Sequence, residues 1–561
     1  VVQEITYWFS ISGKANQMID GLICSEDLFY FFIVIGLFLS LSVLKLHSER
    51  KVISKSRCIV TCIGILTFVL LLEYVCTRPA CMWYCDVTQD KSRTLSKGSQ
   101  EVMKALDGGL TITTYVNLLD DHRWQGLPAN RVYDVRGFRQ FTRFKPEIQM
   151  RYVYYYDQTD NPILDKLYPN LSMEERAREL ARVEDLDFDK FLSPEEIREK
   201  IDLTSEGNRF VRLLERENGR KTFLRIYNDG QANPGEREII AALKRLTIVP
   251  PKVGFLTGHD ERSIRQVGEW DYSAFAANIG FRYSLVNIGF DVEEVDLRDT
   301  IPGDIHVLVI ADLKKPLTDD EQEYLQRYVD KGGNLFILAT ATRQELLNPV
   351  TRSLGVYFEP GILVQNHKQH QQDLILGEIT SEAIHFSPEF FSNKASGKCI
   401  TMPRAVAINC NGQSDFRITP ILETSAKGCW NEQETIDFVN QVATLGPGEQ
   451  EKSYPLMVML DREVGSKKQH ILVVGCADCI SNGELTRTRN DVNSNNYSLI
   501  MESFRVLGDG VFPVDVSRPA PVDNAIKIGE TGLIVLKWFA LFILPLGIVM
   551  GGVWVWRRRR K

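Results

Sequence analysis

Three long apolar runs interrupt a chain in which polar and apolar positions otherwise alternate. They cover residues 28–46, 58–76 and 532–556 and contain few charged residues. The hydrocarbon core of a bilayer is about 30 Å thick, so a helix needs roughly 20 apolar residues at 1.5 Å each to cross it. The pattern therefore predicts three transmembrane helices, two near the start of the chain and one near its end.

Basic residues beside these runs predict how they are oriented. The segment 47–57, which joins the first two runs, holds several lysines and arginines, and the basic cluster 557–561 directly follows the third run. Cytoplasmic loops carry an excess of such residues. Both clusters are thus expected in the cytoplasm. The long portion between the second and third spans, and residues 1–27, are then expected outside the membrane. Because no earlier span delivers residues 1–27 there, we expect this chain to be the end of a longer membrane protein; the alternative is a protein with three spans only and its N-terminus outside.

The first part of the outer portion, residues 77–248, alternates strand and helix patterns. A helix capped by Ser96 is followed by a βαβ pattern, and charged helices then begin at capping boxes on Ser172 and Ser193. This order is typical of a thioredoxin-like domain, here without redox cysteines and with helical connectors. The predicted strands are 110–116, 147–155, 210–215 and 222–227, and the main predicted helices are 130–144 and 235–246.

The second part, residues 249–512, predicts an α/β domain. Helical patterns separate the first four of five apolar runs, and one such helix begins at a capping box on Thr318 and ends at Gly332. Alternation of this kind favours a mostly parallel sheet covered on both faces. The five runs are 253–256, 292–297, 306–310, 335–339 and 471–475.

Two further segments complete the second part. Residues 355–454 are irregular and β-rich, with expected strands at 405–409 and 418–423, and we interpret them as an insertion in the α/β domain. A helix over 497–507 then leads to a proline-bearing linker, 513–531. The outer portion is therefore predicted to hold two domains and a linker back to the membrane.

Composition and missing motifs exclude several functions. The net charge is −7, and no basic stripe lies outside the membrane flanks, so nucleic acid is not an expected partner. The chain holds neither a G-x-x-x-x-G-K-[ST] phosphate loop nor a G-x-S-x-G nucleophile elbow. If ATP and magnesium are used, they must bind to a partner subunit, and we expect no cofactor in this chain.

The most site-like local sequence is Gly258, His259, Asp260 and Glu261, directly after the first strand of the α/β domain. Ligands often bind at the carboxyl ends of parallel strands, and these residues offer a base, two carboxylates and free backbone amides. The alternative is a structural turn from strand to helix. Without a partner nucleophile, we favour the turn over catalysis and leave small-ligand binding open.

Other candidate groups have simpler interpretations. His367 and His370 lack a convincing third ligand, so no metal site is predicted. Cys476 and Cys479 have C-x-x-C spacing but follow a strand, whereas thioredoxin-type pairs open a helix. We expect a structural disulfide or a pair of buried thiols there, and not a redox centre.

Several segments resemble the gliding-motility-associated ABC transporter auxiliary family, known as GldG. The resemblance includes the opening of its periplasmic domain, the first strand of the α/β domain and the last span with its basic tail. The matching segments are 86–88 (DVT), 92–96 (SRTLS), 111–115 (TITTY), 252–261 (KVGFLTGHDE), 306–311 (HVLVIA) and 319–338.

Residues 11–31 and the span after them resemble the last outer loop and last helix of an ABC-2 type permease. The chain thus resembles a fusion of permease and auxiliary subunit. The resemblance also implies a degenerate glutamine-amidotransferase-like fold for the α/β domain. Where that fold carries a nucleophilic cysteine, residues 339–342 carry no thiol, and Cys476 stands where the family tends to have an acid.

The resemblance implies a non-enzymatic permease and auxiliary subunit of an ABC-2 type transporter, in a bacterial inner membrane with a large periplasmic domain and a cytoplasmic C-terminus. The expected partners are a cytoplasmic ABC ATPase, membrane lipid, a second copy or another permease, and an unknown cargo or envelope protein. The alternatives are a membrane-tethered periplasmic hydrolase that uses His259 and Glu261 on a glycan or peptide, and a structural envelope scaffold.

Overall fold

The computed structural model describes residues 11–50, 55–76, 78, 82–298, 300–385, 387–518 and 529–560. The chain divides into two compact units, one made of Val1–Thr94 with Arg518–Lys561 and the other of Leu95–Ser517. Parts of the predicted permease end (1–10), linker (519–528) and basic tail (561) lie outside the described residues.

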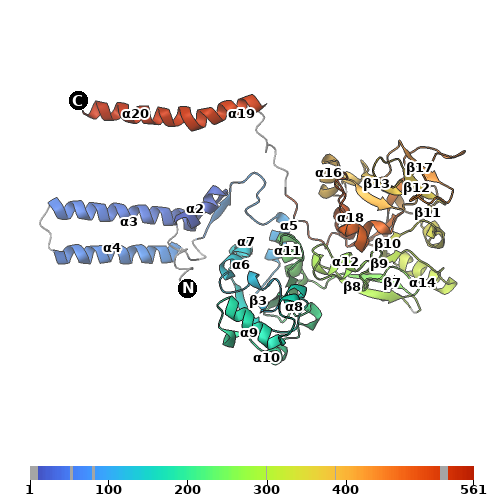
Figure 1. Cartoon of the computed structure of the whole chain (residues 1–561), viewed down its shortest axis with the longest axis horizontal. Coiled ribbons are helices and arrows are strands. Elements are labelled where there is room, and N and C mark those ends of the chain that lie inside the picture. The colour runs from blue at the N-terminus through green and yellow to red at the C-terminus, as the bar shows by residue number, and fades with distance from the viewer. Residues whose placement is uncertain are drawn as a thin grey trace. The chain divides into compact units, whose positions relative to one another are not determined.

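The first unit contains the three candidate membrane helices. α3 spans Ser25–Arg50, α4 spans Lys55–Cys76, and the last helix runs through α19 (Gly529–Trp538) and α20 (Leu544–Arg559) (Figure 1). Among the described residues, these three helices are long and apolar enough to cross a membrane. The three predicted spans are therefore confirmed as candidate membrane helices by length and composition.

A wide π-helical turn, Phe539–Ile543, interrupts the last span just before Pro545. A proline inside a helix has no N–H to donate, and its ring clashes with the carbonyl four residues earlier, here that of Leu541. A π-turn is one of the local adjustments that relieve this clash. Pro545 is thus the local cause of the irregularity, and the helix continues beyond it.

Short segments on either side of α3 and α4 pair with each other. Helix α2 (Ile11–Ile19) leads into β1 (Leu22–Cys24), which is antiparallel to β2 (Tyr84–Asp86). The Ser25 N–H donates to the Trp83 carbonyl at 2.7 Å. The segments before the first span and after the second therefore meet at the same end of the helical hairpin.

The second unit begins with a four-stranded sheet in the order β4-β3-β5-β6. β3 is parallel to β4 and antiparallel to β5, and β6 is antiparallel to β5. One face packs on helices α5, α7 and α11 through a shared hydrophobic cluster. The strands are β3 (Leu110–Asn117), β4 (Ile148–Tyr155), β5 (Val211–Arg216) and β6 (Lys221–Arg225), and the helices are α5 (Lys97–Lys104), α7 (Arg139–Phe144) and α11 (Glu236–Arg245).

The predicted helix starts are confirmed, but one predicted helix is divided. Ser96 caps α5, and the capping boxes on Ser172 and Ser193 open α9 (Met173–Val183) and α10 (Pro194–Lys200). The pattern over 130–144 predicts one helix, whereas the structure has α6 (Arg131–Gly137) and then α7, with Phe138 between them. Phe138 is buried in the cluster beneath the sheet, so tertiary packing explains the break.

A nine-stranded sheet dominates the rest of the second unit, in the order β14-β13-β16-β18-β19-β10-β9-β7-β8. The five strands from β19 to β8 are mutually parallel, and the other four are antiparallel. The strands are β7 (Lys252–Thr257), β8 (Asp291–Asp296), β9 (Ile305–Ala311), β10 (Asn334–Leu338), β13 (Leu374–Ile379), β14 (Ile400–Pro403), β16 (Arg417–Glu423), β18 (Pro455–Val464) and β19 (Lys467–Val474).

The sheet is therefore mixed, and the prediction of a mostly parallel sheet describes only one half of it. The turn at Gly465 and Ser466 joins β18 to β19, and Gly465 has a φ of 62° that suits a two-residue hairpin. This hairpin reverses the strand direction. Three strands of the segment 355–454 then extend the same sheet.

Two other predictions need correction. The described residues between β8 and β9 contain no helix, although a helical pattern was expected there; the connection is a short loop. The strand expected over 405–409 is reduced to β15 (Ile408–Asn409). The backbone groups of Ala405 and Val406 each form a hydrogen bond with a different neighbouring segment, so these two residues do not extend the strand. The remaining predicted strands of the α/β domain are confirmed.

Helices cover both faces of the parallel half. Alternate strand residues pack on α12 (Ser273–Ala276), α13 (Leu285–Ile288) and α18 (Asn496–Leu507) on one face, and on α14 (Asp319–Asp330) and α15 (Asn348–Ser353) on the other. The first hydrophobic cluster continues through α11 into the four-stranded sheet. The two predicted outer domains thus share one core across residue 249.

Candidate functional site

Polar residues follow the carboxyl ends of four adjacent parallel strands. His259 follows β7, Asp312 follows β9, Thr340 follows β10 and Asp478 follows β19. In open α/β sheets this edge is where ligands and reactive groups collect. Its contents therefore decide what chemistry the domain can perform.

Arg262 lies at the centre of this edge and is almost fully buried. Its Nε donates to Asp312 Oδ2 at 2.8 Å, and its Nη2 donates to Asp478 Oδ1 at 2.6 Å and to Thr340 Oγ1 at 3.3 Å. Nη1 donates to the Trp270 carbonyl at 2.6 Å. The guanidinium thus ties together the loops after β7, β9, β10 and β19.

A second arginine completes the cluster. Arg343 Nη2 donates to the other oxygen of Asp312, Oδ1, at 2.7 Å. Burial opposes the charge on Arg262, but Tyr272, Asp478 and Asp312 raise the pKa of Arg262 above its ordinary value. Since Tyr272 itself has a pKa raised by burial and is neutral at pH 7, the two carboxylates are the groups that stabilise the guanidinium.

The cluster is closed and leaves one acceptor unused. Tyr272 is fully buried and covers the loop after β19, because its hydroxyl donates to the Ala477 carbonyl at 2.7 Å. Asp478 Oδ2 is buried without a hydrogen-bond partner. Ala339–Thr342, where the resemblance would place a nucleophile, contributes only the Thr340 hydroxyl, and that accepts from Arg262. The edge therefore presents a salt-bridged arginine and no exposed nucleophile.

The predicted residues Gly258, His259, Asp260 and Glu261 form the neighbouring turn. His259 Nδ1 lies 3.1 Å from Glu261 Oε1, and Nε2 lies 3.1 Å from Glu321 Oε2. Both ring nitrogens of His259 therefore face carboxylates of the protein, and neither is left for a substrate. Gly258 and Asp260 have φ values of 119° and 59°, which make the tight bend.

The other two residues of this turn differ in exposure. The Asp260 carboxylate forms an ion pair with Lys315 Nζ at 2.7 Å, and both side chains are exposed. Lys315 holds the pKa of Asp260 below its ordinary value. The side chain of Glu261 is only 3% exposed, and its Oε2 accepts from the His259 backbone N–H at 2.8 Å. The arrangement is that of a hydrogen-bonded turn, although the sequence alone could not show the link to Glu321.

Glu321 connects this turn to α14, because it is also the third residue of the Thr318 capping box. Burial alone would raise the pKa of Glu321, but hydrogen bonds from Thr318 and the His259 ring hold it below its ordinary value. A carboxylate with a lowered folded pKa adds stability above its unfolded pKa, and that stability is lost as the pH falls through the folded pKa.

Replacing Glu321 by glutamine is expected to lower the free energy of unfolding by about 1 kcal/mol at pH 7, because its charge-assisted contacts with the Thr318 N–H and the His259 ring become neutral ones. The difference from the wild type should shrink as the pH falls below about 4.3, the ordinary pKa of glutamate. Guanidinium unfolding of the full chain in detergent at pH 7, 5 and 4 measures this. Glu323→Gln, at an exposed position of the same helix, is the control, and a pH-independent difference would contradict the prediction.

Sequence reasoning found the turn but missed the arginine cluster beside it. Arg262 directly follows the predicted motif, and Asp312 directly follows a predicted strand. A search for the first hydroxyl or charged residue within four positions after these parallel strands would have selected Asp312, Thr340 and Asp478. No local signal shows that they share one buried guanidinium, because their separations along the chain are large.

Cys476 and Cys479 are buried free thiols in this structure. Cys476 Sγ donates to the Pro403 carbonyl, and Cys479 Sγ donates to the Cys476 carbonyl, each at 3.0 Å. Burial, reinforced by Cys479 and Asp478, raises the pKa of the Cys476 thiol well above its ordinary value. Since the thiolate is the reactive form, this thiol is held in an unreactive state.

We expect iodoacetamide at pH 8 to alkylate Cys476 at least about 100-fold more slowly in the native chain than in the unfolded chain, because reaction requires exposure and ionisation. Quantitative mass spectrometry of the labelled peptides measures both rates. Cys399, which is partly exposed, serves as the internal reference. Equal alkylation of Cys476 and Cys399 in the native chain would contradict the expectation.

Comparison with known proteins supports a transport role for this part of the chain. Residues 250–503 match the family model ABC_transp_aux, described as "ABC-type uncharacterized transport system". The matched region includes the whole parallel sheet and the arginine cluster. The match, over less than half of the chain, supports an ABC transporter auxiliary family and an association with other transporter components. No curated protein matches the chain.

Three of the solved structures that match show weak similarity. The mmIFT52 N-terminal domain has 14% identity and a TM-score of 0.31, covering 46% of this chain and 98% of its own. The exo-beta-1,4-mannosidase Op5Man5 from Opitutaceae bacterium strain TAV5 has 11% identity and a TM-score of 0.25, covering 66% of this chain and 48% of its own. A ThuA-like protein from Parabacteroides merdae has 11% identity and a TM-score of 0.22, covering 44% and 95%. All three TM-scores are below 0.5, so these similarities do not bear on fold or function.

Proposed function

We propose that this protein is a membrane-anchored, non-catalytic auxiliary subunit of an ABC-type transporter, and that the unit Leu95–Ser517 binds a cargo or an envelope partner. The carboxyl edge of the parallel sheet is the observation that carries this proposal. Arg262 occupies it with Asp312 and Asp478, where an enzyme of this architecture would place its reactive groups. At this edge the Arg262 cluster holds four loops together. We therefore assign binding, and not catalysis, to the surface of the unit Leu95–Ser517.

Further features support a more specific proposal. The resemblance to GldG covers segments in both outer regions, and the first segments resemble the end of an ABC-2 permease. The strand order β4-β3-β5-β6, with one parallel and two antiparallel pairs, fits a thioredoxin-like domain. The five parallel strands with helices on both faces fit a degenerate amidotransferase-like domain. We propose that the chain fuses the end of a permease to a GldG-like auxiliary subunit.

The membrane topology follows from the spans and the flanking charges. We propose that the protein lies in a bacterial inner membrane, with unit Leu95–Ser517 in the periplasm and the C-terminal arginines in the cytoplasm. The pairing of β1 with β2 supports this arrangement, because it needs residues 22 and 86 on one side of the membrane. A separate cytoplasmic ATPase would bind ATP and magnesium, and the spans would contact lipid and a second copy or another permease.

Purification from the native membrane in mild detergent tests the proposal. Mass spectrometry should identify a stoichiometric ATPase with a phosphate-binding loop, and the complex should hydrolyse ATP. A Walker-lysine variant of the co-purified ATPase should abolish hydrolysis without releasing this chain. Isolation of this chain without any ATPase would overturn the proposal and favour a structural scaffold.

The hydrolase alternative has its own test. Alanine at both His259 and Glu261 would abolish function in cells if these residues were catalytic. The structure favours the opposite expectation, because both ring nitrogens of His259 already contact carboxylates. We expect a variant that keeps the fold, such as His259→Gln, to retain function.

A further inference from the structure

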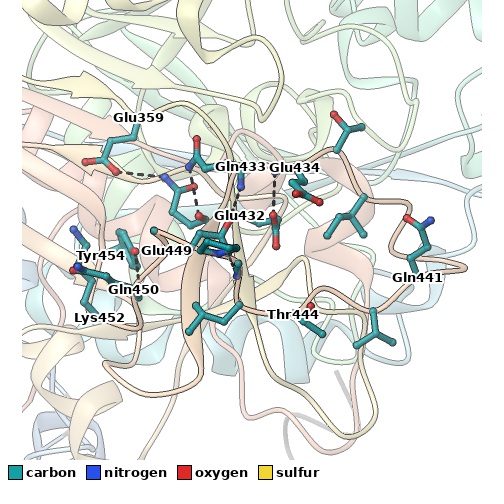
Figure 2. A pocket seen from close by; sticks show the side chains of 18 residues that line it. Glu359, Glu432, Gln433, Glu434, Gln441, Thr444, Glu449, Gln450, Lys452 and Tyr454 are labelled. Carbon is teal, nitrogen blue, oxygen red and sulfur yellow. Dashed lines mark hydrogen bonds between the residues drawn. The ribbon is translucent and has the colours of Figure 1, made fainter.

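A large hollow lies away from the arginine cluster, beside a small two-stranded sheet. The sheet pairs β12 (Ile362–Gln365) with β17 (Cys429–Glu432), and the loop after β17 forms most of the wall. The cavity has a volume of about 1110 Å³. Figure 2 shows the labelled side chains around it, with Gln441 on the loop at one side and Lys452 and Tyr454 at the other.

The wall of the hollow is held in place and is strongly acidic. Ala443 N donates to Gln372 Oε1 at 2.6 Å and anchors the loop, together with an apolar contact of Ala443, Val364 and Trp430. Among the lining residues, the only charged side chains are four glutamates and one lysine. They are Glu359, Glu432, Glu434, Glu449 and Lys452.

Only uncharged groups satisfy these carboxylates. Glu432 accepts from Trp430 Nε1 at 3.2 Å and from the Glu434 backbone N–H at 3.0 Å, and Glu449 accepts from the backbone N–H of Gln433 and of Gly446. In the part of the chain that the structure describes, none of the four forms an ion pair. Since Glu432 is only 3% exposed, its charge is buried without a cation.

A neutral group in the same wall also lacks a partner. Asn431 is 8% exposed and lines the hollow. Its Nδ2 donates to the Pro360 carbonyl at 3.0 Å, whereas its Oδ1 is buried with no hydrogen-bond partner. An unused acceptor beside uncompensated carboxylates calls for a ligand that brings hydrogen-bond donors and positive charge.

Size and geometry distinguish between cationic ligands. Within the described residues, no three of these carboxylates bring ligand atoms within 4.8 Å of one another; the group with that spacing is Asp120, Asp121 and His122, in the four-stranded part. One metal ion would not bridge the hollow. The same loop exposes Val439, Val442 and Leu445, at 76%, 78% and 49%. Exposed apolar residues around a polar hollow are typical of a surface that binds a polypeptide.

We propose that this hollow binds a basic, partly apolar segment of a partner polypeptide, with lysine or arginine side chains directed to the accessible carboxylates of Glu359, Glu434 and Glu449 and apolar side chains on the loop. The inference rests on the proposed binding role of the unit Leu95–Ser517 and names the site and the chemistry of the partner, and its test needs no ATPase. A failure to bind the probe below therefore leaves the ATPase experiment unaffected.

Fluorescence anisotropy with the full chain in an uncharged detergent tests this inference. The probe is a fluorescein-labelled octapeptide of alternating lysine and leucine, and the reference replaces each lysine by glutamate, with empty micelles as blank. The wild type should bind the lysine peptide at least about ten-fold more tightly than the glutamate peptide, and the binding should weaken with salt. Equal affinity for the two peptides, or no binding of the lysine peptide, would overturn the inference.

Charge-reversal variants locate the binding. Glu434→Lys changes an exposed lining residue and should lower the affinity for the lysine peptide by about ten-fold. Glu463→Lys, at an exposed position on β18 outside the hollow, should change this affinity by less than about two-fold. Lys452→Gln removes the only lining cation and should tighten binding. If Glu434→Lys and Glu463→Lys have equal effects, binding reflects net charge alone and the inference is wrong.

Discussion

Replacing Arg262 by methionine is expected to lower the free energy of unfolding by about 3–5 kcal/mol. Its guanidinium is almost fully buried and pairs with Asp312 at 2.8 Å and with Asp478 at 2.6 Å. Methionine fills much of the same volume but leaves Asp478 as a buried charge without a cation, while Asp312 keeps only Arg343. Removing one member of a buried ion pair is strongly destabilising for this reason.

Chemical unfolding of the full chain in detergent measures this effect, with tryptophan fluorescence as the signal. Arg265→Met is the matched control, because Arg265 is 75% exposed and its ion pair with Glu294 should contribute at most about 1 kcal/mol. Adding Asp478→Asn to Arg262→Met should recover part of the loss, since it removes the uncompensated charge. Equal destabilisation by the Arg262 and Arg265 variants would refute the structural role assigned to the cluster.

Replacing Phe512 by alanine is expected to destabilise the unit Leu95–Ser517 by about 3–5 kcal/mol, the range for a fully buried phenylalanine. Its ring is 0% exposed and lies edge-on to Phe290 with the centroids 6.0 Å apart. It also covers Gly289, where a Cβ would lie 2.1 Å from the Phe512 Cδ1 atom. The ring therefore fills a space shaped for it at the end of the sheet domain.

The same unfolding experiment applies, and Phe391→Ala is the control. Phe391 is 59% exposed, so its truncation should cost less than about 1 kcal/mol. Gly289→Ala tests the contact from the other side and should also destabilise, because Gly289 has a φ of 124° and no room for a side chain. A Phe512 variant as stable as the Phe391 variant would show that the ring does not anchor this segment.

The arginine cluster shows why a sequence predicts only part of a candidate site. The motif ending at Glu261 stands out because glycine and acidic residues are concentrated after a clear strand. Arg262, one position further on, looks like an ordinary charged residue. Its importance depends on Asp478, which is distant in sequence and becomes a neighbour only because β19 is added beside β10.

The sheet shows the same limit for the fold. Five parallel strands were predicted from apolar runs, since each run is a property of a few consecutive residues. Three strands of the antiparallel half fall in the segment 355–454, whose irregular pattern predicts an insertion, and the fourth, β18, is not predicted. Only the hairpin between β18 and β19 shows that these strands continue the same sheet.

The sequence by itself determined the three long apolar helices, the starts of the capped helices and most strands of the outer portion. These depend on local causes: the length of an apolar run, a serine or threonine at a helix start and the alternation of side chains along a strand. The tertiary structure alone decided the mixed order of the large sheet, the buried partners of Arg262 and the acidic hollow. Those features depend on which distant segments lie side by side, and burial then sets the energy of each charge.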